Sequence, residues 1–231
     1  MAIFAIADLH LSFGVQKPMD IFKGWENYTE RLHENWQKYI NKDDTVVIAG
    51  DISWATSFDE LYPDLKFINE LNGQKIISKG NHDYWWQTAL KLKKFCADNN
   101  FDTISFLHNN SYFCEGLNLC GTRGWMFDDY LKPEDEKILN REALRLKASL
   151  DSAQNDGEKI VFLHYPPIAG SNVCRQILDI LHEYGIKRCY YGHLHNLKGR
   201  ELFDMQYEGI IFNLISSDYI NFEPVFVPKG L

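Results

Sequence analysis

Short β-branched runs alternate with longer amphipathic segments along the chain, and this alternation limits the folds open to it. Alternating apolar runs between turn residues predict strands, whereas a 3.6-residue apolar period predicts helices. We expect strands over 3–7, 45–49, 75–78, 103–107, 159–163 and 188–191, and helices over 26–40, 58–71, 85–98, 134–153 and 173–184. Strands separated by helices pair in parallel through right-handed crossovers. The sequence therefore predicts an α/β fold with sheets inside and helices outside.

Two other segments favour antiparallel pairing, so we expect mixed sheets. The run SYFCEGLNLCGT is a predicted hairpin that turns at Glu115-Gly116. Near the end of the chain, the run YEGIIFNLI, followed by FEPVFV, also predicts antiparallel strands. No repeat, low-complexity tract or Pro/Gly/Ser-rich linker divides the 231 residues. We therefore expect a single domain over residues 1–231.

The composition narrows the classes of function. A formal net charge of −8 argues against a surface that neutralises many phosphates, so we do not expect long nucleic acid as a partner. The first residues, MAIFAIADLHL, lack the basic start of a signal peptide, and no apolar run reaches membrane-spanning length, so we expect no membrane association. An odd number of cysteines without a C-x-x-C pair indicates reduced, mostly buried thiols in a cytoplasmic protein: Cys96, Cys114, Cys120, Cys174 and Cys189.

Side chains able to bind a metal come directly after several predicted strands. They are Asp8 and His10, then Asp51, then Asn81 and His82, then His164, and finally His193 and His195. The carboxyl ends of parallel strands share one edge of a sheet, where open α/β sheets bind ligands. In extended backbone, residues two apart point the same way, so Asp8 with His10, and His193 with His195, should each face one site. Leu9 and Leu194 should then face the core.

The donor types favour a metal centre. Carboxylates, an amide oxygen and imidazoles, with no thiolate nearby, suit divalent Mn, Fe, Zn, Ni or Co and leave positions open for water and substrate. These donors are too many for one ion with an open site, so two ions sharing a carboxylate is the simplest arrangement. Asp51 is the natural bridge because it lies between the two groups in the sequence. Each of these histidines taken alone is better explained by a structural hydrogen bond, and only the set favours ligands. For His33, His108 and His182, which have no such motif around them, we prefer the structural interpretation.

In chain order, these motifs resemble the signature of the calcineurin-like metallophosphoesterases over nearly the whole chain. The matching residues are Asp8-x-His10, Gly50-Asp51, Gly80-Asn81-His82-Asp83, His164 and Gly192-His193-Leu194-His195. The resemblance implies a four-layer αββα sandwich with a two-metal centre. It implies one ion held by Asp8, His10, Asp51 and His195, and a second held by Asp51, Asn81, His164 and His193. His82 would lie over the scissile phosphate rather than bind an ion. Asp83 would orient the His82 ring, and its side chain also suits a cap on the following helix, a role compatible with the first.

The resemblance also implies a metal-dependent phosphoesterase acting on a small phosphomonoester or phosphodiester. Two cations about 3.5–4 Å apart would clamp the phosphate and lower the pKa of a bound water toward roughly 7, so that metal-bound hydroxide attacks phosphorus. His82 would assist the departing oxygen as a general acid or a charge stabiliser.

Two alternatives belong to other classes of protein. One is a metal-binding scaffold without catalysis, like the retromer subunit that resembles this family, although the presence of His82 argues against it. The other is a nuclease that works within a complex, like the family's DNA-repair members, although the short chain and acidic balance argue against it.

Substrate contacts are predicted from residues near these motifs. Protein serine/threonine phosphatases of the family carry an acidic-Arg pair shortly after Gly-Asp, and GDISWATS lacks it, so a phosphoprotein substrate is disfavoured. Arg123, at a predicted strand end, and Arg200 are candidates to bind phosphate instead, because guanidinium matches phosphate in a bidentate way. The competing interpretation is that each is an ordinary surface or structural arginine, and Arg123 is the better candidate of the two.

The aromatic run after the His82 motif has two interpretations. If Trp85 begins the next helix, it joins the core stripe of that helix, and Trp86 points about 100° away from it. Trp86, Tyr84 and Trp54 are then candidates for the wall of a substrate pocket. The competing interpretation is that these rings pack at the edge of the sandwich.

Overall fold

The first of two large sheets is built mostly from parallel strands near the start of the chain. The computed structural model describes residues 1–126, 133–197 and 205–230. In this sheet the strand order is β13-β1-β2-β3-β4. The parallel members are β1 (Ile3–Ile6), β2 (Thr45–Ala49), β3 (Gln74–Ser78) and β4 (Ile104–Phe106). The last strand, β13 (Val225–Val227), adds antiparallel to β1.

The second sheet has the order β11-β12-β10-β7-β6-β5. Its parallel centre consists of β6 (Leu117–Thr122), β7 (Glu158–Leu163), β10 (Arg188–Tyr191) and β12 (Ile210–Leu214), and its antiparallel edges are β5 (Tyr112–Cys114) and β11 (Met205–Tyr207). A short separate hairpin joins β8 (Ile168–Ala169) to β9 (Asn172–Val173). The predicted turn at Glu115-Gly116 is confirmed, with φ angles of 54° and 83° that suit a tight hairpin.

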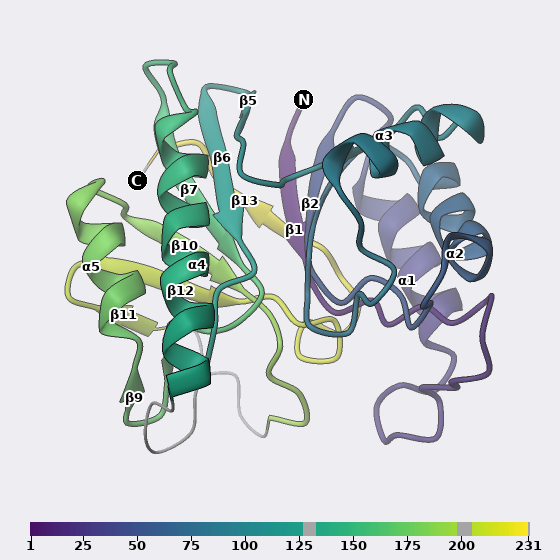
Figure 1. Ribbon diagram of the computed structural model, residues 1–231. Coiled ribbons are helices and arrows are strands. Elements are labelled where there is room, and N and C mark those ends of the chain that lie inside the picture. Colours follow the sequence, from purple (N-terminus) through teal and green to yellow (C-terminus); the bar gives the residue numbers. More distant parts are fainter. Residues whose placement is uncertain (127–132, 198–204, 231) are drawn as a thin grey trace.

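Helices cover the outer face of each sheet (Figure 1). The first sheet carries α1 (Tyr28–Tyr39), α2 (Phe58–Glu70) and α3 (Ala89–Asp98), and the second carries α4 (Pro133–Asp151) and α5 (Arg175–Glu183). Alternate residues of one strand serve two cores: Val47 packs between the sheets, whereas Ile48 packs under the helices. The second sheet repeats this with Phe162 and Val161. The predicted four-layer αββα arrangement is confirmed.

One helix begins later than the sequence suggests. The expected start of α3 was Trp85, but the helix starts at Ala89 because the Thr88 side chain caps it by accepting the Lys91 backbone N–H. The preceding residues form tight turns, in which Tyr84 N–H donates to the His82 carbonyl. Other boundaries differ from the expected ones by one or two residues, which is the usual spread. The helical-angle argument for Tyr84 and Trp86 therefore does not hold, although Trp85 is in the core, as expected.

The five cysteines form no disulfide, and all except Cys114 are buried. Within residues 1–126, 133–197 and 205–230, no helix has both the length and the apolarity that crossing a membrane requires.

A buried arginine ties the end of the chain to the second sheet, and its removal should destabilise the protein. Arg188 is 2% exposed, makes a bidentate pair with Glu158 at 2.9 and 2.6 Å, and donates to the Pro228 carbonyl. We expect Arg188→Met to lower the unfolding free energy by about 2–3 kcal/mol. This is somewhat less than the loss on breaking a fully buried ion pair, because Glu158 is partly exposed. Arg175→Met, which breaks an exposed pair with Glu208, is the matched control and should cost at most about 1 kcal/mol in urea unfolding. Equal losses would contradict this role of Arg188.

Candidate metal centre

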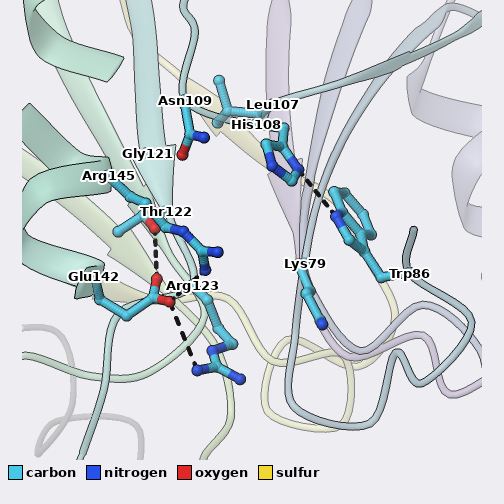
Figure 2. Close-up of a pocket in the computed structure, with 10 residues that line it drawn as sticks. All are labelled: Lys79, Trp86, Leu107, His108, Asn109, Gly121, Thr122, Arg123, Glu142 and Arg145. Atoms are coloured by element: carbon cyan, nitrogen blue, oxygen red, sulfur yellow. Dashed lines mark hydrogen bonds and ion pairs between the residues drawn. The ribbon is translucent and has the colours of Figure 1, made fainter. Parts of the chain in front are cut away.

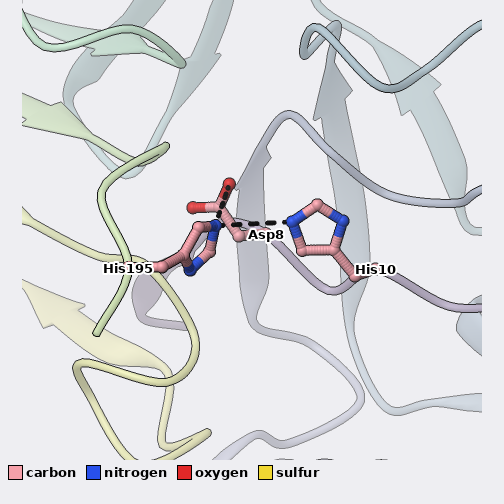
Figure 3. A group of neighbouring side chains, drawn as sticks. All are labelled: Asp8, His10 and His195. Atoms are coloured by element: carbon pink, nitrogen blue, oxygen red, sulfur yellow. Dashed lines mark hydrogen bonds and ion pairs between the residues drawn. The ribbon is translucent and has the colours of Figure 1, made fainter. Parts of the chain in front are cut away.

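The predicted ligand residues meet at one edge of the sandwich, where strands of both sheets end. Two groups form there, Asp8 with His10 and His195, and Asp51 with His164 and His193, and the candidate ligand atoms within each group lie within 4.8 Å of one another. Figure 3 shows the first group, in which dashed lines join His195 Nε2 to the Asp8 carboxylate and to the His10 ring. The groups contain ligands from both sheets, so the site exists only when the two sheets pack together.

The backbone that positions these side chains is left-handed rather than extended. The φ angles are 61° at Asp8, 46° at His10, 52° at Asp51 and 73° at His193. The expectation that Asp8 and His10 share a face through an extended segment is therefore wrong in its geometry, although both residues do face the site and Leu9 is buried between them. Left-handed conformations at non-glycine residues are strained and often mark functional sites. Here they turn the chain sharply at the strand end.

Two glycines allow the ligand loops to touch. A Cβ added to Gly50, whose φ is +90°, would lie 2.7 Å from His164 Nδ1. At Gly80, a Cβ would lie 2.1 Å from Asp51 Oδ1. Both positions are too close for any side chain, so both motifs require glycine for packing, and Gly50 also for its positive φ.

Asp51 lies between the two groups. Its Oδ1 accepts the His82 backbone N–H at 2.8 Å, which leaves Oδ2 for the site. Oδ2 is 3.7 Å from His10 Nε2 in one group and 3.4 Å from His164 Nε2 in the other. One carboxylate oxygen therefore faces both groups, as a bridging ligand would.

The hydrogen bonds around the histidines fit metal binding. His195 Nδ1 lies 2.8 Å from Asp218 Oδ1, and His164 Nδ1 lies 3.2 Å from the Ala49 carbonyl oxygen. Each ring can donate a hydrogen bond from Nδ1 and present Nε2 as an electron-pair donor to a metal. His10 Nε2 then lies only 3.4 Å from His195 Nε2, and Asp8 Oδ1 is buried without a hydrogen-bond partner. Lone pairs this close repel one another unless a proton or a cation lies between them. The donor set therefore fits divalent ions.

The charges at the site also favour a bound cation. Burial, with the nearby charge of Asp8, raises the pKa of Asp51 to about 8. Burial lowers the pKa of His10 to about 3 and that of His193 to about 4, so both rings are neutral, as metal ligands must be. For His195 burial acts in the same direction, but the Asp8 and Asp218 carboxylates outweigh it and raise the pKa to about 10. The buried carboxylates of Asp8 and Asp51 therefore have only the His195 ring as a positive partner within the two groups, and a bound cation would supply the missing charge.

Asp83 ties two ligand loops together instead of orienting His82. The buried carboxylate accepts backbone N–H groups from Gly80, Asp51, Ile52 and Ser53 at 2.7–3.3 Å, and the Trp85 indole N–H at 3.1 Å. Burial, with the charge of Asp51, raises its pKa to about 7. Among the described residues it has no bond to the His82 ring, whose Nδ1 is buried without a partner. Asp83 does not cap α3 either, because Thr88 does. Both expected roles for Asp83 are corrected.

His82 borders the centre without belonging to either group. Its Nε2 lies 4.0 Å from Asp51 Oδ2, and its side chain is 33% exposed. Burial and the neighbouring His164 lower its pKa. A group at this position can reach a substrate atom while leaving the ligand positions free.

The candidate aromatic residues separate into different places. Trp54 stacks on His10 at 5.0 Å and tilts against His82 at 4.4 Å, so it borders the site. Tyr84 is 59% exposed and meets the His82 ring edge-on. Trp86 instead donates its indole N–H to His108 Nδ1 at 3.0 Å and lines a neighbouring cavity. Contact of these rings with substrate stays a prediction.

Arg123 follows β6, as expected, and lies next to the second group. Its carbonyl accepts the backbone N–H groups of His164 and Tyr165, and its guanidinium is 3.6 Å from the buried Glu142. Arg200, the other candidate, lies outside the described residues.

Several residues at the site have no signal in the motifs. Asp218 orients His195, and only its place in a polar run after β12 could have pointed to it. Trp25 is 2% exposed and packs against His10 and His195 with ring centres 5.7 and 5.8 Å away. The Tyr165 ring is 4.3 Å from that of His193. These neighbours are set by folding rather than by spacing along the chain.

The chain is similar to known proteins in sequence and in fold. A family model described as calcineurin-like phosphoesterase matches residues 1–197. Phosphopantetheinyl hydrolase from Mycobacterium tuberculosis is similar in structure, with a TM-score of 0.61 at 13% identity, and the match covers 99% of this chain and 96% of that one. A protein of unknown function from Aquifex aeolicus has a TM-score of 0.54 at 18% identity, covering 97% and 95%. No curated protein sequence matches the chain. At identities this low, the structural similarity shows a shared fold and nothing further about function.

Proposed function

Because the chain belongs to the calcineurin-like phosphoesterase family, we propose that it is a metal-dependent hydrolase of small phosphomonoesters or phosphodiesters. The observation that carries this proposal is the Asp51 carboxylate, one oxygen of which faces both ligand groups. A single structural ion would not need a second group of histidine and carboxylate ligands on the far side of that oxygen. An arrangement for two ions is the one that family enzymes use for hydrolysis.

Each residue of the centre has a proposed role. One ion would be held by Asp8, His10, His195 and Asp51, and the other by Asp51, Asn81, His164 and His193. When bound, such ions withdraw charge from phosphate oxygens and lower the pKa of a coordinated water. Trp54 and Tyr84 form the wall beside His82 and exclude water from the reacting phosphate. His82 donates a proton, or a hydrogen bond, from Nε2 to the leaving oxygen.

A metal add-back experiment tests this function. Protein stripped with a chelator is mixed with Mn, Fe, Ni, Co or Zn and assayed with p-nitrophenyl phosphate and bis-p-nitrophenyl phosphate. We expect hydrolysis of at least one substrate only after a metal is restored, together with a rise in melting temperature. A rise in melting temperature without hydrolysis of either substrate would instead support the metal-binding scaffold.

Replacement of His82 separates catalysis from metal binding. His82→Ala should retain the metals, because His82 belongs to neither ligand group, and should lower kcat by roughly 10²–10⁴-fold for an alkyl phosphate. The loss should be smaller for p-nitrophenyl phosphate, whose leaving group needs less protonation. His33→Ala, on the exposed side of α1, is the control and should change neither property. Loss of metal from the His82 variant would make His82 a ligand, and an unchanged kcat on the alkyl ester would exclude the proposed role.

A further inference from the structure

A cationic cavity opens beside the metal centre, between the two sheets and α4. It has an inner volume of about 70 Å³, whereas roughly 10–15 Å³ of such space holds one water. Lys79, Arg123 and Arg145 line it, and in Figure 2 the two arginines lie on the α4 side, whereas Lys79 lies with Trp86 and His108 on the other side. We call the cavity around these three basic residues the cationic pocket.

A buried carboxylate positions the two arginines of the cationic pocket. Glu142 on α4 is fully buried and accepts hydrogen bonds at 2.7 Å from Thr122 Oγ1 and from Arg145 Nη1, with Arg123 Nη2 3.6 Å away. Figure 2 shows Glu142 between the arginines on the α4 side. The carboxylate therefore engages one terminal nitrogen of each arginine and leaves their other donor atoms for a ligand.

Several donors of the cationic pocket lack an acceptor. Arg123 Nε is buried without a hydrogen-bond partner, and Lys79 has no ion pair among the described residues. His108 Nδ1 accepts the Trp86 indole N–H, so the neutral ring carries its proton on Nε2 as a further donor. Three cations balanced by one carboxylate leave a net charge of +2. Buried or half-buried donors without acceptors are costly, and an anion would satisfy them.

The cationic pocket and the second ligand group share two chain segments. Lys79 directly precedes the Gly-Asn-His-Asp motif, whose Asn81 Oδ1 is 2.7 Å from His164 Nε2. Arg123 accepts the His164 backbone N–H with its carbonyl, while its side chain lines the cavity. The cationic pocket is therefore built on the same two loops that carry ligands of the second group.

We propose that the cationic pocket binds a second phosphate group of the substrate, so that the enzyme acts on small molecules with two phosphates, one cleaved and one held. This inference rests on the proposed function for the cleaved group. A phosphate monoester carries about −1.5 to −2 charge at pH 7 and three acceptor oxygens, which match the net charge and the donors of the pocket. A carboxylate carries half that charge and fewer acceptors.

Binding of inorganic phosphate to chelator-treated protein tests the pocket without catalysis. By calorimetry we expect phosphate to bind, and Arg145→Gln to weaken it roughly 10-fold or more, the loss for one charge-assisted hydrogen bond. Arg141→Gln, the same change at an exposed position of α4 outside the pocket, should bind as the wild type does. Lys79→Gln repeats the test if Arg145→Gln proves unstable. Equal phosphate affinity in all variants, or no binding at all, would overturn the proposal.

The identity of the anion and the link to hydrolysis need separate measurements. Acetate serves as the carboxylate probe, and acetate binding as tight as phosphate binding would overturn the assignment to a phosphate group. On the metal-loaded enzyme, the ratio of kcat/KM for a sugar bisphosphate to that for the sugar monophosphate should fall about 10-fold in Arg145→Gln, mainly through KM. An active enzyme whose ratio does not change would overturn the second-phosphate role alone. Phosphate binding in an enzyme with no activity would leave the pocket standing and overturn the proposed function.

Discussion

Asp51→Asn should abolish metal-dependent hydrolysis while leaving the protein folded. The substitution keeps the shape of the side chain and the oxygen that accepts the His82 backbone N–H at 2.8 Å. It removes the negative charge whose oxygen faces His10 on one side and His164 on the other. Loss of partners that only orient ligands already costs about 10–100-fold in metal affinity, so loss of a shared ligand should cost more for both ions. Activity should fall to the background of the assay.

Metal content and thermal unfolding check this prediction. The wild type should gain roughly 2.7 kcal/mol of stability per site at a metal concentration of 100 Kd, and Asp51→Asn should lose this gain. Without metal, the variant should be at least as stable as the wild type, because it removes repulsion between the buried carboxylates of Asp51 and Asp8. Asp64→Asn is a matched control, since Asp64 is equally buried but binds Ser53 and Phe13 instead of facing the ligand groups. A variant of Asp51 that keeps two tightly bound ions would rule out the bridge.

The position of the centre could be predicted because strand periodicity and motif position are both local signals. The residues of β2 alternate between the two cores, and Asp51 is the first charged residue after them. A charged residue at that position has to face solvent or a ligand, so it marks the end of the buried strand. Parallel pairing of β1, β2 and β3 then brings successive strand ends together. The left-handed backbone at Asp8 and His10 could not be predicted this way, because residues of those types adopt it only when the surrounding structure stabilises it.

The role of Asp83 was predicted wrongly for a different reason. Its place before an apolar stretch suggested a helix cap, and its place after His82 suggested a partner for that ring. The five N–H groups that it accepts come from the Gly-Asp loop, the Gly-Asn-His-Asp loop and the Trp85 indole, so the contacts exist only after two strands have paired. Asp218, which lies 23 residues from the His195 that it orients, shows the same limit. Tertiary partners of this kind have no signature in spacing.

Asp83→Ala should be among the most destabilising single substitutions in this chain. Each buried donor left without an acceptor costs about 1–3 kcal/mol, and the substitution leaves five of them unpaired. Removing a buried charge offsets part of this cost, so we expect a net loss of about 4 kcal/mol or more in unfolding free energy. Asp83→Asn should cost less, about 2–4 kcal/mol, because one oxygen remains while the new amide faces N–H groups on the other side.

The Asn variant distinguishes a structural Asp83 from one that acts through His82. If Asp83 holds the loops, Asp83→Asn lowers metal affinity and stability together, because Asp51 and Asn81 lie on the loops that it joins. Once saturating metal is restored, its kcat should recover to within a few fold of the wild type. Asp44→Asn provides the control, since Asp44 is also buried and accepts N–H groups from Ala2 and Asn41, but far from the centre, and should leave metal affinity unchanged. A low kcat at saturating metal, with normal stability, would instead restore the pairing of Asp83 with the His82 ring.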